Sequence, residues 1–187
     1  KRGVGDSDGV YQEAASSSNL QKIAEDAIAG VKYLASRPEI DAKRIGLIGG
    51  SQAGWVIPLA ASQSGVISHM VILSGPVEST SQEDVFSSYT NDGDTATEYD
   101  DAKITEQIRT MSPGGFDPIP IIAKLNQPGV WLWGSVDKSV PVTLSAENLQ
   151  ALIDSGKDNF SYKIFPNGDH TLNESLHGLF AEIPYSP

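Results

Sequence analysis

The chain has 187 residues, which is the size of one domain and enough to bury a hydrophobic core. Its composition is typical of a globular protein, with 39% hydrophobic and 20% charged residues. The formal net charge of -11 argues against binding to nucleic acid or to anionic membranes, because both need a basic patch. Since there is no cysteine, a disulfide framework, a thiolate metal site and a cysteine nucleophile are excluded.

The chain begins with a glycine-rich loop and an amphipathic helix. Residues 1–9 are polar and rich in glycine, which predicts a loop. A phosphate-binding loop is the alternative, but no Gly-Lys-Ser/Thr follows. Apolar side chains then recur at helical spacing over residues 20–36, after N-capping residues at 16–19 and before Pro38.

The most informative stretch is 44–55, Arg-Ile-Gly-Leu-Ile-Gly-Gly-Ser-Gln-Ala-Gly-Trp. A short apolar strand at 45–48 ends in two glycines and Ser51, and an apolar helix follows. Such a strand–turn–helix exposes a serine hydroxyl above the sheet and places backbone N–H groups where they can stabilise an oxyanion. Small residues are needed on either side of the serine, and Gly49 and Ala53 meet that requirement. The alternative is an ordinary glycine-rich loop, so these residues alone leave catalysis undecided.

Residues 76–128 form an acidic insertion within the single domain. From Ile45 to Ala102 there is no Lys or Arg, whereas Asp and Glu recur. We expect a cap-like segment over the end of the sheet, with a short helix at 101–111. Its acidity could select cationic substrates, although a solvated surface is the simpler interpretation. Asp92, Asp94, Glu98 and Asp100 do not have the spacing of a twelve-residue calcium loop.

The remaining elements alternate between strand and helix, which predicts an α/β fold with a mostly parallel sheet and flanking helices. The expected strands after the first are 69–75, 129–134 and 160–165, and the expected later helices are 141–155 and 172–181.

Three reactive side chains follow successive strands of this sheet. Ser51 follows the first strand, Asp137 the third and His170 the fourth, which places all three at the carboxyl edge where ligands bind. This chain order is that of the α/β-hydrolase triad, in which histidine takes the serine proton and a buried carboxylate orients the histidine. His69 starts a strand and His177 falls in the expected last helix, so both are poorer bases.

The sequence resembles the α/β-hydrolase superfamily, in particular serine hydrolases of the prolyl-oligopeptidase and dienelactone-hydrolase branches. The matching segments are residues 1–7, 41–54, 133–141 and 165–170. Because segment 41–54 follows the fourth of eight strands in that superfamily, the resemblance implies an N-terminally truncated fold that keeps about the fifth to eighth strands. The second oxyanion donor would then be missing, and Gln52 N–H would be the one donor that the chain provides.

These observations predict a serine hydrolase that cleaves a carboxylic ester through an acyl-enzyme on Ser51. A peptidase, thioesterase or acyltransferase of the same fold, or a non-catalytic fragment, remains as the alternative. No metal or organic cofactor is implied, because the triad supplies nucleophile, base and orienting carboxylate. The expected partner is a small ester or acyl substrate. The exposed edge of strand 45–48 predicts either pairing with another chain, such as a second copy, or a rearranged N-terminal segment.

Overall fold

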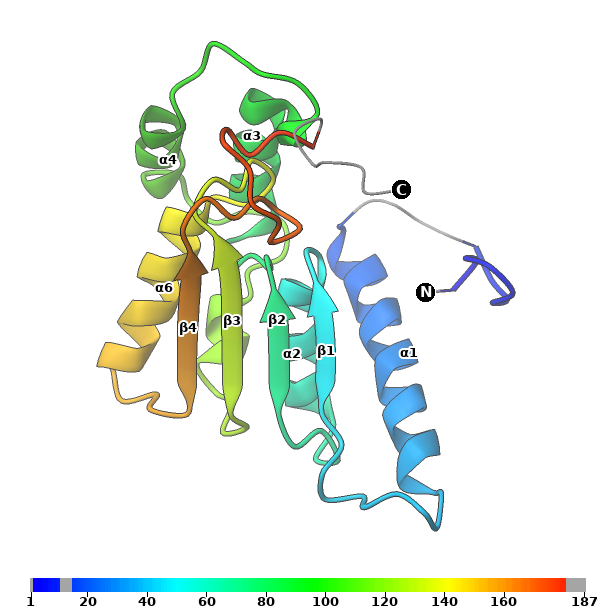
Figure 1. Cartoon of the computed structure of the whole chain (residues 1–187). Coiled ribbons are helices and arrows are strands. Elements are labelled where there is room, and N and C mark those ends of the chain that lie inside the picture. The colour runs from blue at the N-terminus through cyan, green and yellow to red at the C-terminus, as the bar shows by residue number, and fades with distance from the viewer. Residues whose placement is uncertain (1, 11–14, 181–187) are drawn as a thin grey trace.

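The computed structural model describes residues 2–10 and 15–180 and contains a four-stranded parallel sheet (Figure 1). The strand order is β1-β2-β3-β4, so each strand pairs with the next one along the chain. The strands are β1 (Leu47–Gly50), β2 (Met70–Leu73), β3 (Gly129–Gly134) and β4 (Phe160–Phe165). The predicted parallel sheet is confirmed, although β1 begins two residues later than the expected 45–48.

Helices connect the strands, as the sequence pattern predicted. They are α1 (Ser17–Ala35), α2 (Ala53–Gln63), α3 (Thr80–Thr90), α4 (Asp101–Arg109), α5 (Ile119–Ile122) and α6 (Val142–Asp154), with a 3-10 turn η1 (Asn91–Gly93). Ser16 caps α1 by accepting a hydrogen bond from the N–H of Asn19 at 3.3 Å. No helix in the described ranges has the length and apolar character needed to cross a membrane.

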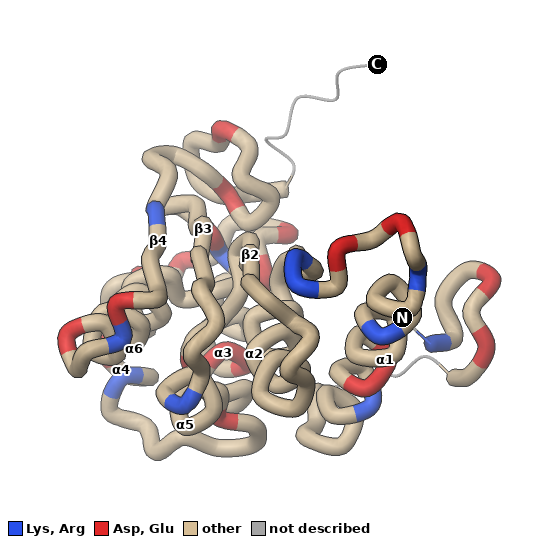
Figure 2. The backbone as a smooth tube through the Cα atoms, turned by 90° about the horizontal axis from the view of Figure 1, so that it is seen from below, with Lys and Arg blue, Asp and Glu red and all other residues tan. Residues whose placement is uncertain are grey.

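The two faces of the sheet are covered differently. Ile72 of β2 and Trp131 of β3 are fully buried on the face against which the helices pack. Figure 2 shows α2, α5 and α6 on one side of the strands. On the opposite face, Ile48 of β1 is 71% exposed, and Val71 and Leu132 are only partly buried. The hydrophobic core of the chain therefore lies on one side of the sheet.

Two helices of the acidic segment lie beyond the carboxyl ends of the strands (Figure 1). α4 agrees with the helix predicted at 101–111, whereas α3 was not predicted. Ser79 and Gln82 form a capping box at the start of α3. The loop after β2 thus leads directly into a helix that faces the carboxyl edge.

The prediction of a helix at 172–181 is wrong for residues 172–180. Ala181 lies outside the residues that the structure describes. Gly168 instead forms an antiparallel bridge with Glu174. The Asp169 carboxylate accepts hydrogen bonds from the backbone N–H groups of Thr171 and Asn173 at 2.8 and 3.0 Å. Leu172 has a φ of 64°, which an α-helix does not allow. His177 accordingly lies in a bend and not in a helix.

Candidate active site

Ser51 sits at a sharp turn between β1 and α2. Its φ of 54° is in the left-handed region, which is uncommon for a residue with a side chain and often marks functional positions. Two backbone hydrogen bonds hold the turn: Ser51 N–H donates to Leu73 O at 2.9 Å, and Gly54 N–H donates to Ser51 O at 2.9 Å. The side chain is exposed at the carboxyl edge of the sheet.

Small residues make this turn possible. A Cβ atom on Gly49 would lie 2.7 Å from the Ala53 Cβ, so the strand and the helix could not approach as they do. A Cβ on Gly54 would lie 2.6 Å from backbone atoms of Gly75 and Pro76. The first turn of α2 therefore packs directly against the loop after β2, and Gln52 is the N-cap residue of that helix.

Asp137 lies in the loop after β3 and is rigidly held. Its Oδ1 accepts hydrogen bonds from the backbone N–H groups of Ser139 at 2.8 Å and Val140 at 2.9 Å. The side chain is completely buried. A buried carboxylate with two backbone donors is fixed in position and ready to accept a further hydrogen bond.

His170 lies in the turn after β4 and contacts Asp137 through one ring nitrogen. Its Nδ1 is 2.9 Å from Oδ2 and 3.0 Å from Oδ1 of that carboxylate. Burial by itself lowers the pKa of His170. The hydrogen bond and charge of Asp137, together with the charges of Asp92 and Asp169, outweigh burial and raise this pKa above its usual value. Nδ1 is thus committed to Asp137, which leaves Nε2 as the nitrogen that could exchange a proton with another group.

Ser51 lines a cavity of about 640 Å³ at the same edge of the sheet. Trp55 of α2 and Glu83 of α3 line it as well. No hydrogen bond joins the Ser51 hydroxyl to the His170 ring in the part of the chain that the structure describes. The structure therefore pairs two of the three predicted residues directly, and the third lies at the same edge of the sheet.

Glu78 is a residue of this region that the sequence did not single out. It follows β2, it is fully buried, and its Oε2 accepts hydrogen bonds from Ser145 Oγ and from the N–H of Val77. Burial raises the pKa of Glu78 to about 8, so the neutral carboxyl is the favoured form near pH 7. Its hydrogen-bond partner on α6 lies 67 residues away, and no local pattern in the sequence could have revealed that contact.

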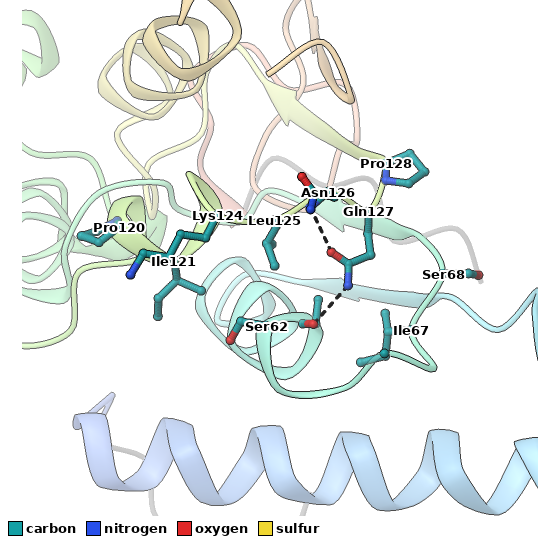
Figure 3. Close-up of a pocket in the computed structure, with 12 residues that line it drawn as sticks. Ser62, Ile67, Ser68, Pro120, Ile121, Lys124, Leu125, Asn126, Gln127 and Pro128 are labelled. Carbon is teal, nitrogen blue, oxygen red and sulfur yellow. Dashed lines mark hydrogen bonds between the residues drawn. The ribbon is translucent and has the colours of Figure 1, made fainter. Parts of the chain in front are cut away.

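A second cavity, of about 730 Å³, lies at the other end of the sheet (Figure 3). It is bordered by the end of α2, by α5 and by the loop before β3, and Gln127 crosses it to donate a hydrogen bond to Ala61 O at 3.2 Å. His69, which hydrogen-bonds Ser68 at 2.9 Å, is also at that end. None of the three predicted site residues lines this cavity, so its size alone does not make it the active site.

Within residues 2–10 and 15–180, no group of three or more His, Asp or Glu side chains is arranged to hold a metal ion. These ranges include the acidic residues 92–100, which were considered as a calcium-binding loop from the sequence.

Known structures share this arrangement of strands and helices. The chain is 22% identical to a puromycin-hydrolysing peptidase from Mycobacterium tuberculosis, with a TM-score of 0.55 over 80% of this chain and 22% of that one. It is 20% identical to a Pyrococcus furiosus esterase, with a TM-score of 0.58 over 87% of this chain and 57% of that one. An acylaminoacyl peptidase from Pyrococcus horikoshii is also 20% identical, with a TM-score of 0.56 over 79% of this chain and 23% of that one. No curated protein sequence matches the chain.

At these identities the similarities define the fold, which is that of the α/β serine hydrolases, and the chain represents only part of it. It spans 22% of the length of the mycobacterial peptidase and 57% of that of the esterase. Residues 1–182 match the prolyl oligopeptidase family, and the chain belongs to that family. The resemblance noted in the sequence, including its partial coverage of the fold, is confirmed.

Proposed function

We propose that this protein is a serine hydrolase that cleaves carboxylic esters through an acyl-enzyme on Ser51. The observation that carries the proposal is the hydrogen bond between His170 Nδ1 and the buried Asp137, at the same sheet edge as the strained turn of Ser51. Membership of the prolyl oligopeptidase family supports the same class of reaction.

In the first half of the reaction, Ser51 Oγ attacks the ester carbonyl carbon while its proton passes to His170 Nε2. Asp137 holds the ring in the required tautomer and stabilises the imidazolium that forms. The tetrahedral intermediate collapses, and the alcohol leaves with the proton from His170, so that an ester on Ser51 remains. Water then attacks this ester with the same proton transfers and releases the acid.

The oxyanion of each tetrahedral intermediate needs hydrogen-bond donors. Gln52 follows the nucleophile directly and begins α2, where backbone N–H groups and the helix dipole favour negative charge. We assign its N–H as one donor. A second donor is normally required, and losing one costs about 2.7–4 kcal/mol of transition-state stabilisation.

Hydrolysis of p-nitrophenyl acetate by the purified chain tests the proposal. We expect turnover that is abolished by Ser51→Ala, with unchanged circular dichroism showing that the variant is folded. If the folded wild type has no activity above background, the chain is a non-catalytic member of the fold and the proposal is wrong.

Amide cleavage is the second candidate activity. Two of the three similar structures described above are peptidases, and the family is named for an oligopeptidase. Comparing an aminoacyl p-nitroanilide with the corresponding p-nitrophenyl ester distinguishes the two. Esterase specialisation predicts that only the ester is turned over efficiently, whereas comparable kcat/KM values would favour a peptidase.

A further inference from the structure

Asp169 is a second buried carboxylate beside the candidate base. It directly precedes His170 in the turn after β4, and it is fully buried. Its Oδ1 accepts three hydrogen bonds, from the N–H and Oγ1 of Thr171, both at 2.8 Å, and from the N–H of Asn173 at 3.0 Å. Because these donors all follow His170 in the chain, the carboxylate joins the segments on either side of the histidine.

The backbone of the turn depends on the same residue. Asp169 N–H donates to Asn173 O at 2.9 Å, and Leu172 N–H donates to Asp169 O at 3.0 Å. The turn lies directly against the end of β3, because a Cβ atom on Gly134 would lie 2.4 Å from Asp169 O. An aspartate that binds nearby backbone N–H groups fixes a turn in one conformation. The position of His170 therefore depends on Asp169.

The other oxygen of this carboxylate distinguishes Asp169 from a residue that only stabilises a turn. Among residues 2–10 and 15–180, its Oδ2 has no hydrogen-bond partner, and no Lys or Arg forms an ion pair with it. A buried negative charge that is only partly satisfied favours a positive charge nearby. The neighbouring group that becomes positive in the proposed reaction is the imidazole of His170.

The charges that perturb His170 are all negative. They belong to Asp137 in the loop after β3, Asp92 in η1 and Asp169 itself. Lys138, which follows Asp137, pairs with a carboxylate of α4. Burial lowers the pKa of His170, but the hydrogen bond to Asp137 and these three charges raise it above its usual value. The charge of Asp169 thus acts in the same direction as that of the triad carboxylate.

We propose that Asp169 is a positioning residue for the reaction, whose Oδ1 holds the turn that carries His170 and whose charge stabilises the imidazolium. The inference rests on the proposed function, because the imidazolium forms when His170 takes the proton of Ser51. Asp137 orients the ring through Nδ1, whereas Asp169 fixes the backbone that carries the ring. An interaction that is stronger with the imidazolium than with the neutral ring lowers the barrier of the reaction.

Titration of His170 by NMR tests the effect of the charge without any substrate. The chain has three histidines, and His170→Gln identifies the His170 signal in protein that carries isotope-labelled histidine. In Asp169→Asn the pKa of His170 should fall below the wild-type value, because a negative charge is removed. The signal of His69, at the other end of the sheet, should titrate as in the wild type.

Glu174→Gln is the matched control, because it removes an exposed carboxylate from the same loop after β4. It should leave the pKa of His170 unchanged. An equal fall of this pKa in Asp169→Asn and Glu174→Gln would mean that only the net charge of the protein matters, and it would overturn the inference.

Two substitutions of Asp169 separate the hydrogen bonds from the charge. In Asp169→Asn the amide oxygen can keep the three bonds to Oδ1, because the NH₂ group replaces the oxygen that accepts none. Asp169→Ala removes the bonds and the charge. At the high-pH plateau, where the ring of His170 is neutral, kcat for p-nitrophenyl acetate should fall by about 100-fold in Asp169→Ala, because the base is misplaced. Asp169→Asn should retain at least about ten times the kcat of Asp169→Ala, with KM little changed in both.

The outcomes separate this inference from the proposed function. An unchanged pKa of His170 in Asp169→Asn overturns the inference, as does a folded Asp169→Ala with the kcat of the wild type or with that of Asp169→Asn. If circular dichroism shows that Asp169→Ala is unfolded, the titration of Asp169→Asn decides. If the wild type does not hydrolyse the ester, the proposed function is wrong, whereas the titration still shows whether Asp169 acts on His170.

Discussion

The two halves of the candidate site differ in how firmly the surrounding structure holds their side chains. On the β3–β4 side, Asp137 is completely buried, has two backbone donors and holds His170 at 2.9 Å. On the β1 side, Ser51 is exposed, and the strand that leads to it forms one edge of the sheet. Ile48 of that strand is 71% exposed.

This difference separates what the chain does by itself from what depends on its surroundings. Orientation of the histidine needs only loops that this sequence contains, and the loops pack on each other through Val136 N–H, which donates to Gly168 O at 3.0 Å. The precise position of Ser51 depends on β1, which pairs only with β2 among the residues that the structure describes. The acid–histidine half should therefore be robust, and the nucleophile half should respond to whatever pairs with β1.

The largest expected effect comes from removing the charge that orients His170. Asp137→Asn keeps the shape of the side chain but favours the wrong tautomer of the imidazole, so kcat for a neutral ester should fall by about 10⁴-fold. The pH at which activity is half-maximal should also fall, because the Asp137 charge raises the pKa of His170 and the neutral ring is the active base. Stopped assays over pH 5–9 measure both effects.

Asp94→Asn is the control for this prediction, since Asp94 is exposed and lies outside the cavity of Ser51. If Asp137→Asn lost no more activity than this control, Asp137 would have no role in catalysis.

The next prediction compares how much a side chain on each face of the sheet contributes to the free energy of unfolding. Trp131 of β3 is fully buried and packs edge-to-face on Phe160 with ring centroids 5.5 Å apart. Trp131→Ala should lower the free energy of unfolding by about 3–5 kcal/mol. Ile48→Ala, on the open face of β1, should change it by less than about 0.5 kcal/mol. Urea denaturation measures both, and similar losses would mean that the Ile48 face is buried in solution.

A smaller effect concerns the pH dependence of stability. The pKa of Glu78 rises from an ordinary value near 4.5 to about 8 because it is buried. The neutral form is therefore favoured by folding, and its stabilising contribution is complete below pH 4.5 and is lost as pH rises towards 8. Glu78→Gln should remove this dependence, so its free energy of unfolding should fall less between pH 5 and pH 8 than that of the wild type. Urea denaturation of the wild type and of Glu78→Gln at pH 5 and pH 8 measures this difference. If both proteins lost the same stability between the two pH values, the pKa of Glu78 would not be raised.

The smallest expected effect on the folded chain concerns the edge of β1 that faces away from β2, where the described part of the chain provides no further strand. Because Leu47 and Ser51 direct their N–H groups towards β2, the alternate residues Ile48 and Gly50 direct theirs away from the sheet. We propose that this edge pairs with that of another copy of the chain. Sedimentation should show concentration-dependent dimers, which Ile48→Lys should convert to monomers without loss of helix content. A wild type that is monomeric at all concentrations would contradict the pairing.

Much of the fold could be predicted from local patterns. The apolar stripe of α1, the uniformly apolar α2 and the four strands are repetitive signals, and their boundaries were found to within a few residues. The helix predicted at 172–181 failed because bonds within the loop after β4, such as the bridge between Gly168 and Glu174, prevail over a short helical pattern. α3 was missed although its capping box, Ser79 and Gln82, is visible in the sequence.

For the site, strand order predicted that Ser51, Asp137 and His170 lie at one edge, because the carboxyl ends of parallel strands lie together. The contact between His170 and Asp137 agrees with that expectation. The raised pKa values of Glu78 and Glu83 could not be predicted, because they depend on burial and on charged neighbours from distant segments. Strand order says which residues lie at an edge, and it does not say how their charges interact.

The most direct test of the account is the reaction of the folded chain with a fluorophosphonate probe, which reports an activated serine without requiring a known substrate. We predict a single adduct, located on Ser51 by peptide mass analysis, that is absent in Ser51→Ala and in heat-denatured protein. Labelling should be slower by orders of magnitude in Asp137→Asn. If folded wild-type protein is not labelled, or is labelled equally after denaturation, Ser51 is not an activated nucleophile in this chain.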